Sequence, residues 1–392
     1  MKHRSVISAV EIGFCIVLTA WVAACTAGVQ SAVSAPVQLW HGLTVSPGGN
    51  LEKDGHPYRG IGVNFVGALR RLLVNPDDPS VPRDFKELEA YHIPFVRFPA
   101  LAVWGTPARC RRYLDRVYVN NPGSYFTAMD NLCAIANEYH VGLIPSLFFT
   151  FWPDALSHHH GLAAANNPQS HVFHIWTQYT IHMVTRYEHN PAIWGWEFGN
   201  EFNLRADLPK TRLPNNKSAW GYTHSQMWEL YGRFVHLVRQ YDPYHIIEAG
   251  NSRPRNDSWH NMVDHTWKKD SPAQWAYMLK KDNAAFDMIC VHEYRGLAPA
   301  NITRVAALAG AWHKPLYVGE FGASGPPAKS RRLFAAILDS ILRNNVPLAS
   351  VWSFDQRLKS SGPHANSITP TNDRRFMLKA IETADEQFLN GH

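Results

Sequence analysis

The sequence predicts a single (β/α)8 barrel, and three observations lead to that fold class. After about residue 40, eight near-continuous apolar runs of five to eight residues alternate with amphipathic stretches. Apolar runs of this length are typical of parallel strands that are covered on both faces. No linker or internal repeat divides the chain, although its 392 residues exceed the usual barrel size of about 250. A strand followed by a helix, eight times over, predicts one α/β barrel with loop insertions.

The strands and helices follow from these patterns in chain order. The expected pairs of strand and following helix are 60–66 with 85–91, 95–99 with 125–140, 142–149 with 171–187, 193–198 with 226–241, 245–249 with 272–280, 288–292 with 305–312, 316–320 with 330–344, and 349–354 with 374–387. Two polar insertions rich in Asn, Pro and Trp, 203–222 and 251–270, follow strand ends and should form walls of a cleft on the catalytic face. Before the first strand, residues 51–55 predict a hairpin with a tight Asp-Gly turn, which should cap the bottom of the barrel.

The beginning of the chain resembles an export signal. Lys2 and Arg4 are followed by an uncharged stretch over 12–24, which matches the apolar core of a signal peptide and is short for a membrane span. We therefore expect three parts: a signal peptide over 1–24, a mature N-terminal segment over 25–45, and the barrel domain over 46–392.

The end of this signal is open to more than one interpretation. The stretch from Val22 to Cys25 resembles a bacterial lipobox, which would lipidate Cys25 and attach the protein to a membrane. Cleavage after Ala27 or Ala35 would instead release a soluble protein, and an uncleaved anchor is a third alternative. In every case we expect an exported protein, which would be secreted, periplasmic or held at the cell surface.

Cysteine usage fits an exported protein. Cys110 and Cys133 could form a disulfide, because such a compartment permits it. Cys290 lies in an apolar run and is expected to be a buried thiol. The spacing of the cysteines does not resemble that of a zinc site.

Composition argues against several classes of partner. The chain is 45% apolar and 18% charged, with a formal charge of +6. Its Lys and Arg residues are scattered, so we do not expect nucleic-acid binding. The 14 Trp and 15 Tyr residues suit sugar rings, although most should belong to the core. We expect a monomer.

Chemistry should gather where the strands end, because the carboxyl ends of the strands carry the active site of such barrels. The candidates at these ends are Asn64, Arg97, Trp152, Asn200, Glu201, Asn251, His292, Tyr294, Glu320, Trp352 and Asp355. Trp220 and Trp259, in the two insertions, are further candidates for stacking on sugars.

Two glutamates four residues apart in the stretch WGWEFGNEFN need different explanations. Glu197 lies inside an apolar run beside two tryptophans, so it needs a structural partner. Glu201 lies just past the strand end, where Glu320 can stand opposite. Two carboxylates across a glycosidic bond can act as acid and nucleophile. Arg97 is placed to keep the nucleophile ionised.

These motifs resemble clan A glycoside hydrolases. WEFGNE at 196–201 is similar to their strand-four signature, and VGEFG at 318–322 is similar to their strand-seven nucleophile motif. VRF at 96–98, HEY at 292–294 and SVW at 350–352 resemble glycoside hydrolase family 5 in particular. The resemblance covers about residues 50–390, and it departs from the family at GNEFN, where Asn-Glu-Pro is commoner.

The resemblance implies a role for each matching residue. Glu320 would be the nucleophile and Glu201 the acid and base, while Asn200 would bind the 2-hydroxyl of the sugar. Arg97 and Tyr294 would contact the nucleophile. His292 would help to bind substrate near Glu201, and Trp352 would support the sugar ring. By their position in the chain, Trp152 is a further candidate for stacking on sugars, and Asn64 and Asn251 are weaker candidates for polar substrate contacts.

The sequence thus predicts an exported retaining β-glycoside hydrolase that acts on a β-linked polysaccharide, with β-mannan or β-glucan favoured. A non-catalytic carbohydrate-binding protein on the same barrel and a transglycosylase are the alternatives, and a metal-dependent hydrolase is a third. His158 to His160, or His171 with His174, could bind a metal, but neither forms a known metal motif. We expect no metal and no organic cofactor.

Overall fold

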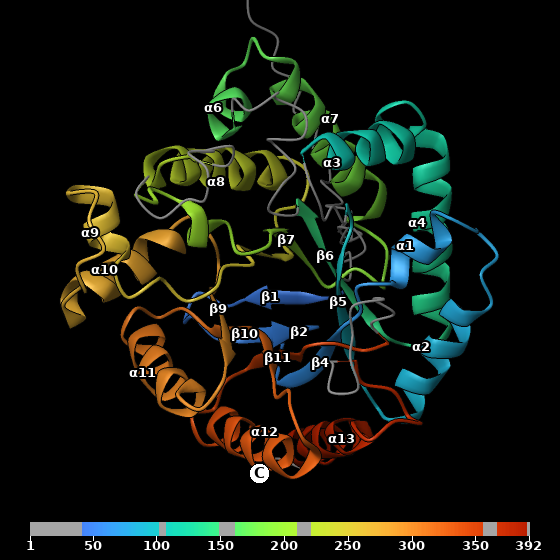
Figure 1. Ribbon diagram of the computed structural model, residues 1–392. Helices are drawn as coiled ribbons and strands as arrows, with labels where there is room; N and C mark the ends of the chain where they lie inside the picture. Colours follow the sequence, from blue (N-terminus) through green and yellow to red (C-terminus); the bar gives the residue numbers. More distant parts are fainter. Residues whose placement is uncertain (1–40, 102–106, 149–160, 210–220, 356–366, 390–392) are drawn as a thin grey trace, which may run out of the picture. The chain divides into compact units, whose positions relative to one another are not determined.

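The computed structural model describes residues 41–101, 107–148, 161–209, 221–355 and 367–389. Eight parallel strands make one sheet in the order β8-β7-β6-β5-β4-β11-β10-β9, which curves into a barrel surrounded by helices (Figure 1). The strands are β4 (Gly60–Asn64), β5 (Phe95–Pro99), β6 (Gly142–Phe148), β7 (Gly195–Gly199), β8 (Ile246–Glu248), β9 (Ile289–Tyr294), β10 (Leu316–Gly322) and β11 (Leu348–Val351). At the seam between β8 and β9, the Asp287 amide donates a hydrogen bond of 3.0 Å to the Ile247 carbonyl. The predicted (β/α)8 barrel is confirmed.

Each predicted helix is present, with bounds that differ from the predicted ones by at most seven residues. These helices are α2 (Ser80–Ala90), α4 (Pro122–Glu138), α7 (His171–Tyr187), α8 (His224–Arg239), α10 (Pro272–Asp282), α11 (Ala298–Ala311), α12 (Pro327–Arg343) and α13 (Arg375–Leu389). The starts of α8 and α10 are encoded locally, because Thr223 and Ser271 form capping boxes with the glutamines three residues later.

Short segments that the pattern analysis missed lie in the loops after the strands. They are α1 (Ala68–Leu72), α3 (Pro107–Leu114), a π-helix (Asp115–Val119), α6 (Gly161–Asn166), a 3-10 turn (Phe202–Arg205) and α9 (Ser258–Val263). All are eight residues or shorter, which leaves too few turns for a helical period to stand out in the sequence.

A small antiparallel sheet at the N-terminal ends of the strands closes the barrel. It consists of β1 (Leu43–Val45), β2 (Leu51–Lys53) and β3 (His56–Pro57). Asp54 and Gly55 both have positive φ, 53° and 77°, as the predicted tight turn between β2 and β3 requires. Leu43 and Leu51 are buried against the apolar side chains at the starts of the strands, so the hairpin caps the barrel bottom as expected.

The barrel interior is layered. The lowest layer is apolar and includes Phe95, Ile144 and Ile246, with Trp194 as predicted for a core residue. Successive inward-facing positions on a strand are two residues apart. The next layer therefore contains the residues two positions further along, which are polar: Arg97, Ser146, Glu248 and, above Cys290 on β9, His292. The sequence thereby places a buried polar layer directly beneath the catalytic face.

Two smaller points follow from the described residues. Cys110, Cys133 and Cys290 are buried thiols, so the structure contains no disulfide between Cys110 and Cys133. Within the described ranges, no helix is both long and apolar enough to cross a bilayer.

Candidate active site

Glu320 faces the barrel interior because β10 contains a bulge. Opposite β9, Tyr317 pairs with Cys290 while Glu320 pairs with His292, so β10 has one residue more than β9 in this interval. Regular alternation from the inward-facing Tyr317 would turn Glu320 outward, and the extra residue reverses this direction. Gly319 occupies the bulge, where a Cβ would lie 3.0 Å from the sulfur of Cys290.

Glu201 reaches the same place through an unusual backbone conformation. It follows β7 with φ 54° and ψ 34°, in the left-handed region that non-glycine residues rarely adopt. A hydrogen bond of 2.8 Å from its amide to the Gly250 carbonyl holds this conformation. The side chain is 31% exposed, so its carboxylate borders solvent while that of Glu320 is 6% exposed.

The two carboxylates meet at His292. Its Nδ1 lies 3.0 Å from Glu201 Oε1 and 3.5 Å from Glu320 Oε2. Oxygens of the two glutamates and a nitrogen of the histidine all lie within 4.8 Å of one another. The other ring nitrogen, Nε2, is buried with no hydrogen-bond partner among the described residues, so Nδ1 is the nitrogen that joins the ring to the two carboxylates.

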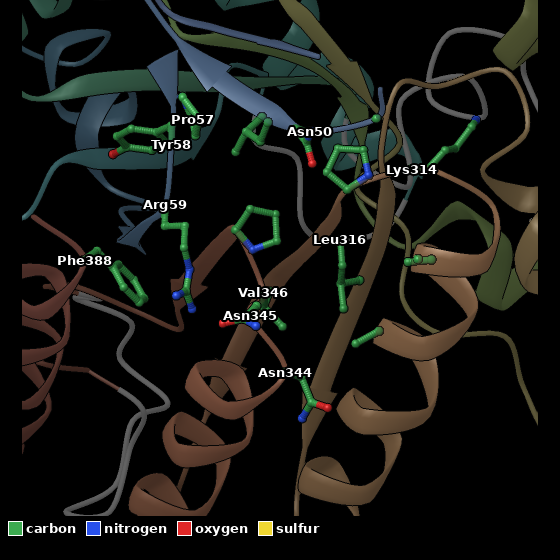
Figure 2. Close-up of a pocket in the computed structure, with 17 residues that line it drawn as sticks. Asn50, Pro57, Tyr58, Arg59, Lys314, Leu316, Asn344, Asn345, Val346 and Phe388 are labelled. Carbon is green, nitrogen blue, oxygen red and sulfur yellow. The ribbon is translucent and has the colours of Figure 1, made fainter. Parts of the chain in front are cut away.

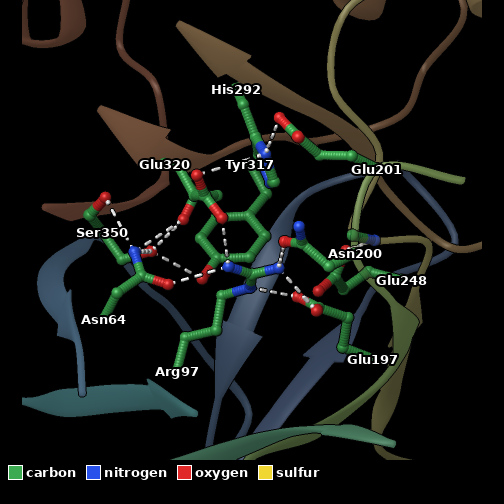
Figure 3. A network of polar contacts seen from close by, with 12 residues as sticks. Asn64, Arg97, Glu197, Asn200, Glu201, Glu248, His292, Tyr317, Glu320 and Ser350 are labelled. Carbon is green, nitrogen blue, oxygen red and sulfur yellow. Dashed lines mark hydrogen bonds and ion pairs between the residues drawn. The ribbon is translucent and has the colours of Figure 1, made fainter. Parts of the chain in front are cut away.

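Arg97 ties the site to the barrel wall, as Figure 3 shows. Its Nη1 donates to Glu320 Oε1 at 2.9 Å, and its Nη2 donates to Asn200 Oδ1 at 2.8 Å. The guanidinium also holds Glu197 through two bonds, from Nε to Oε2 and from Nη2 to Oε1. Glu197 is fully buried, so it has the structural partner that the sequence requires.

Both oxygens of Glu320 therefore have donors. Arg97 binds Oε1, and the Tyr294 hydroxyl donates to Oε2 at 2.6 Å. Hydrogen bonds from a cation and a phenol stabilise a carboxylate anion. The contacts that the family resemblance implies for Arg97 and Tyr294 are thus present in the structure.

Glu201 has a different environment. Burial is the largest single influence and raises its pKa, but the hydrogen bond and charge of His292, the charge of Arg97 and a hydrogen bond to Ser252 together outweigh it. The net result is a pKa below the ordinary value for glutamate. The two carboxylates are therefore held by separate groups, Glu320 from beneath and Glu201 from the side.

The side chains of Glu201, His292 and Glu320 carry oxygen and nitrogen atoms that could act as ligands of a divalent cation. However, Arg97 and Tyr294 already donate to the two oxygens of Glu320, and the guanidinium places a positive charge 2.9 Å from that carboxylate. A second cation there would be repelled by the first. The donor set fits proton transfer and nucleophilic attack better than metal binding.

Comparison with solved structures shows what this arrangement resembles. The chain is similar to an endo-1,4-β-mannanase from Rhizomucor miehei, with a TM-score of 0.65 and 16% identity over 88% of this chain and 99% of the other. A family 5 mannosidase from the same organism matches with a TM-score of 0.65 and 12% identity, over 90% of this chain and 99% of the other. An exo-β-1,4-mannosidase from an Opitutaceae bacterium matches with a TM-score of 0.59 and 17% identity, over 88% of this chain and 63% of the other. The fold is that of the family 5 glycoside hydrolases. No protein-family model and no curated protein matches the sequence.

Some candidates lie elsewhere than expected in this family 5 fold. Asn64 is 2% exposed, and its amide is engaged by Arg97, Gly319 and Ser350, so it supports Arg97 from below. Asn251 is fully buried between Tyr231 and the Asp282 carbonyl, so the prediction that it contacts substrate is wrong. Its side chain turns into the protein and joins the barrel to α10.

The tryptophan candidates have mixed outcomes. Trp352 directly follows β11 and is half-buried, and its peptide bond to Ser353 is cis. Trp259, in the insertion after β8, is half-buried with its ring edge-on to His260. Trp152 and Trp220, like the histidines at 158–160 and Cys25, lie outside the described residues.

Sequence reasoning missed three polar residues around the pair. Ser252, in the loop after β8, hydrogen-bonds Glu201. Asn203 donates to the Ser252 carbonyl at 2.7 Å, which joins the two insertions beside Glu201. Glu248 lies behind Glu197 in the polar layer (Figure 3). Its position two residues after the inward-facing Ile246 was a signal that could have identified it.

A second cavity, of about 680 Å³, lies at the opposite face of the family 5 barrel (Figure 2). The hairpin, α11, the loop after α12 and the end of α13 line it, and no acidic residue is among the lining residues. Its two cations are engaged, since the Lys314 ammonium donates to three backbone carbonyls and the Arg59 guanidinium lies over the Phe388 ring. This end of a barrel serves stability, so the face with the acid pair remains the candidate for the active site.

Proposed function

We propose that the protein is a retaining β-glycoside hydrolase. The observation that carries this proposal is the approach of Glu201 and Glu320, whose nearest oxygens lie within 4.8 Å. Carboxyl groups about 5–5.5 Å apart are typical of retaining enzymes, whereas inverting enzymes need about 6.5–9.5 Å for a water molecule. The spacing here therefore supports a retaining mechanism.

The mechanism follows from the donors around each carboxylate. In the first step an oxygen of Glu320 attacks the anomeric carbon, and the bond to the leaving oxygen breaks as that oxygen takes the proton of Glu201. In the second step Glu201 removes a proton from water, the water oxygen attacks the anomeric carbon, and the Glu320 carboxylate is released. Asn200, oriented by Arg97, would bind the 2-hydroxyl.

The first step requires Glu201 in its protonated form. Since the contacts with His292 lower the pKa of Glu201, the protonated fraction falls early as pH rises. We therefore propose an acidic optimum on natural substrates. The same low pKa makes Glu201 an ionised base, ready for the second step.

We propose a β-mannan or manno-oligosaccharide as substrate, with β-glucan as the second candidate. The support is the similarity of the fold to endo-mannanases and to exo-acting mannosidases. Since both modes of action occur on this fold, the pattern of products should decide between internal and terminal cleavage.

A substrate panel tests the activity. Wild type, Glu201→Ala and Glu320→Ala are assayed on mannan, glucomannan, carboxymethylcellulose, xylan and aryl β-glycosides. Glu320→Ala should be inactive, and Glu201→Ala should lose about 10²- to 10⁴-fold on polysaccharide, the usual contribution of general acid–base catalysis. Azide should partly restore Glu201→Ala on an aryl glycoside with a good leaving group, which needs no acid.

A matched control comes from the next position along β9. Glu293 follows His292 but is bound by Asn301 of α11 at 3.0 Å, away from the acid pair. Glu293→Gln should keep the activity of the wild type. Equal inactivation of Glu293→Gln and Glu320→Ala, with both proteins folded, would remove the support for our assignment.

The same panel separates the alternatives. A non-catalytic carbohydrate-binding protein would bind mannan but would release no reducing sugar from it. A transglycosylase would give longer products when an acceptor sugar is added. A metal-dependent hydrolase would lose activity with a chelator, whereas the acid pair should be unaffected.

Export is part of the proposal and rests on the first 24 residues of the sequence. Expression of the full chain in a bacterial host should give a processed protein in the exported fraction. Metabolic labelling with a fatty acid, lost in Cys25→Ser, would support the lipobox, and a free N-terminus after Ala27 or Ala35 would contradict it.

A further inference from the structure

One buried acid beneath the site has no part in the mechanism so far. Glu248, the last residue of β8, is 0% exposed and pairs in register with Glu197 of β7, which is also 0% exposed. Figure 3 shows the two carboxyl groups side by side behind the Arg97 guanidinium. Two carboxylates on neighbouring strands thus share one dry compartment.

The charges around this compartment do not balance two anions. Among the described side chains that face the pair, Arg97 is the one cation, and it also holds Glu320. The groups from the neighbouring strands are neutral: the Ser146 hydroxyl, the Cys290 thiol and the Tyr317 phenol. Adjacent buried carboxylates of equal charge repel each other, so one of them takes up a proton.

Geometry indicates which oxygen carries that proton. Glu248 Oε2 accepts a hydrogen bond of 2.6 Å from the Gly250 amide, so Oε2 acts as an acceptor. Glu248 Oε1 is buried with no hydrogen-bond donor among the described residues. Glu197 already accepts two bonds from Arg97 and suits the ionised form. The two carboxyl groups are hydrogen-bonded to each other, so a proton on Glu248 Oε1 can be donated to Glu197.

We propose that Glu248 is a neutral carboxylic acid that donates its proton to Glu197, and that this singly charged pair positions Arg97 for Glu320 and Asn200. This inference rests on the proposed function for its kinetic consequences. Burial, and then the charge of Glu197, raise the pKa of Glu248 well above its usual range, which agrees with the geometry.

The pair affects catalysis through Arg97. All three guanidinium nitrogens are used: Nε and Nη2 bind Glu197, and Nη1 binds Glu320. A second full charge beneath Arg97 would draw the guanidinium away from Glu320 and oppose ionisation of the nucleophile. Gly250 connects Glu248 to Glu201, because its amide donates a hydrogen bond to Glu248 and its carbonyl accepts one from the Glu201 amide. Glu248 is thus a positioning residue for both members of the acid pair.

Infrared difference spectroscopy tests the proton directly. The infrared spectrum of wild type minus that of Glu248→Gln, both recorded at slightly alkaline pH, should show the carbonyl band of one protonated carboxylic acid. The subtraction removes the bands of other protonated carboxyls, such as Glu293, whose pKa burial raises to about 7. Absence of the band overturns the shared proton, whatever substrate the protein acts on and even if it acts on none.

Kinetics on an aryl glycoside test the positioning role. Glu248→Gln keeps a donor to Glu197 and should stay within roughly threefold of wild-type kcat, while Glu248→Leu removes the donor and should lose about 10- to 150-fold in kcat with little change in KM. The acidic limb of the pH profile should move in Glu248→Leu alone. Equal losses in both variants overturn the role, and so does wild-type kcat in Glu248→Leu. If Glu248→Leu does not fold, the infrared band and the Glu248→Gln kcat still decide.

Discussion

The shared proton of Glu197 and Glu248 has a consequence for stability that can be measured without any substrate. In the folded protein the pair binds one proton, whereas in the unfolded chain both glutamates have a pKa of about 4.3 and are ionised at neutral pH. Wild type therefore releases this proton on unfolding. In Glu248→Gln the pair binds no titrating proton in either state, so this release is absent.

The magnitude follows from that count. A group whose folded pKa is raised contributes stability that is complete below its unfolded pKa and is lost as pH rises toward its folded pKa. One proton corresponds to about 1.4 kcal/mol per pH unit. Between about pH 6 and pH 8, the free energy of unfolding of Glu248→Gln should thus rise relative to that of wild type, by up to about 3 kcal/mol when the folded pair keeps its proton across the whole window.

Urea denaturation followed by tryptophan fluorescence, at three pH values in this window, measures the difference. The exposed Glu386 of α13 provides the control, since Glu386→Gln should differ from wild type by the same amount at each pH. A difference between wild type and Glu248→Gln that stays constant from pH 6 to pH 8 would refute the reasoning, because Glu248 would then be ionised in the folded protein.

Three further substitutions probe the site itself. Tyr294→Phe removes the 2.6 Å hydrogen bond to Glu320 and should lower kcat/KM on an aryl glycoside about 10- to 150-fold, and an unchanged value would show that the bond is idle. His292→Ala removes the groups that lower the pKa of Glu201, so the alkaline limb of kcat/KM on mannan should move to higher pH; a shift to lower pH contradicts this. Gly250→Ala places a Cβ 1.7 Å from a backbone carbonyl of β7 at φ 64°, and thermal melts should show severe destabilisation, which a wild-type melting temperature would disprove.

The barrel could be predicted from the sequence because every strand is a short apolar run and every covering helix is amphipathic. Both signals are local, so they survive without knowledge of the tertiary structure. The short segments such as α6 and α9 could not be predicted in this way. They are stabilised by contacts with neighbouring elements, for example the hydrogen bond of 2.8 Å from the Asn166 side-chain amide of α6 to the Gln226 carbonyl of α8, and such contacts join residues distant in sequence.

The site was predictable to different depths. Glu201, Arg97 and His292 end predicted strands, and this is enough to bring them to one face. Glu248 was missed although the period of two places it in the interior, because nothing in the stretch HIIEAGN distinguishes a buried acid from a solvated one. Asn251 was misassigned for the related reason that a strand end predicts the face of the barrel but not the direction of a side chain.

The two carboxylates themselves lie where regular geometry fails. Alternation along LYVGEFG would point Glu320 away from the interior, and only the bulge at Gly319 turns it inward. Glu201 needs a left-handed backbone that costs of order 1–3 kcal/mol for a residue with a Cβ. Each departure is held from the same polar layer, the first by Arg97 on Glu320 and the second by the Gly250 carbonyl on the Glu201 amide. A barrel that needed only to be stable would require neither departure, so their coincidence at two facing acids is itself an argument that this end of the barrel performs chemistry.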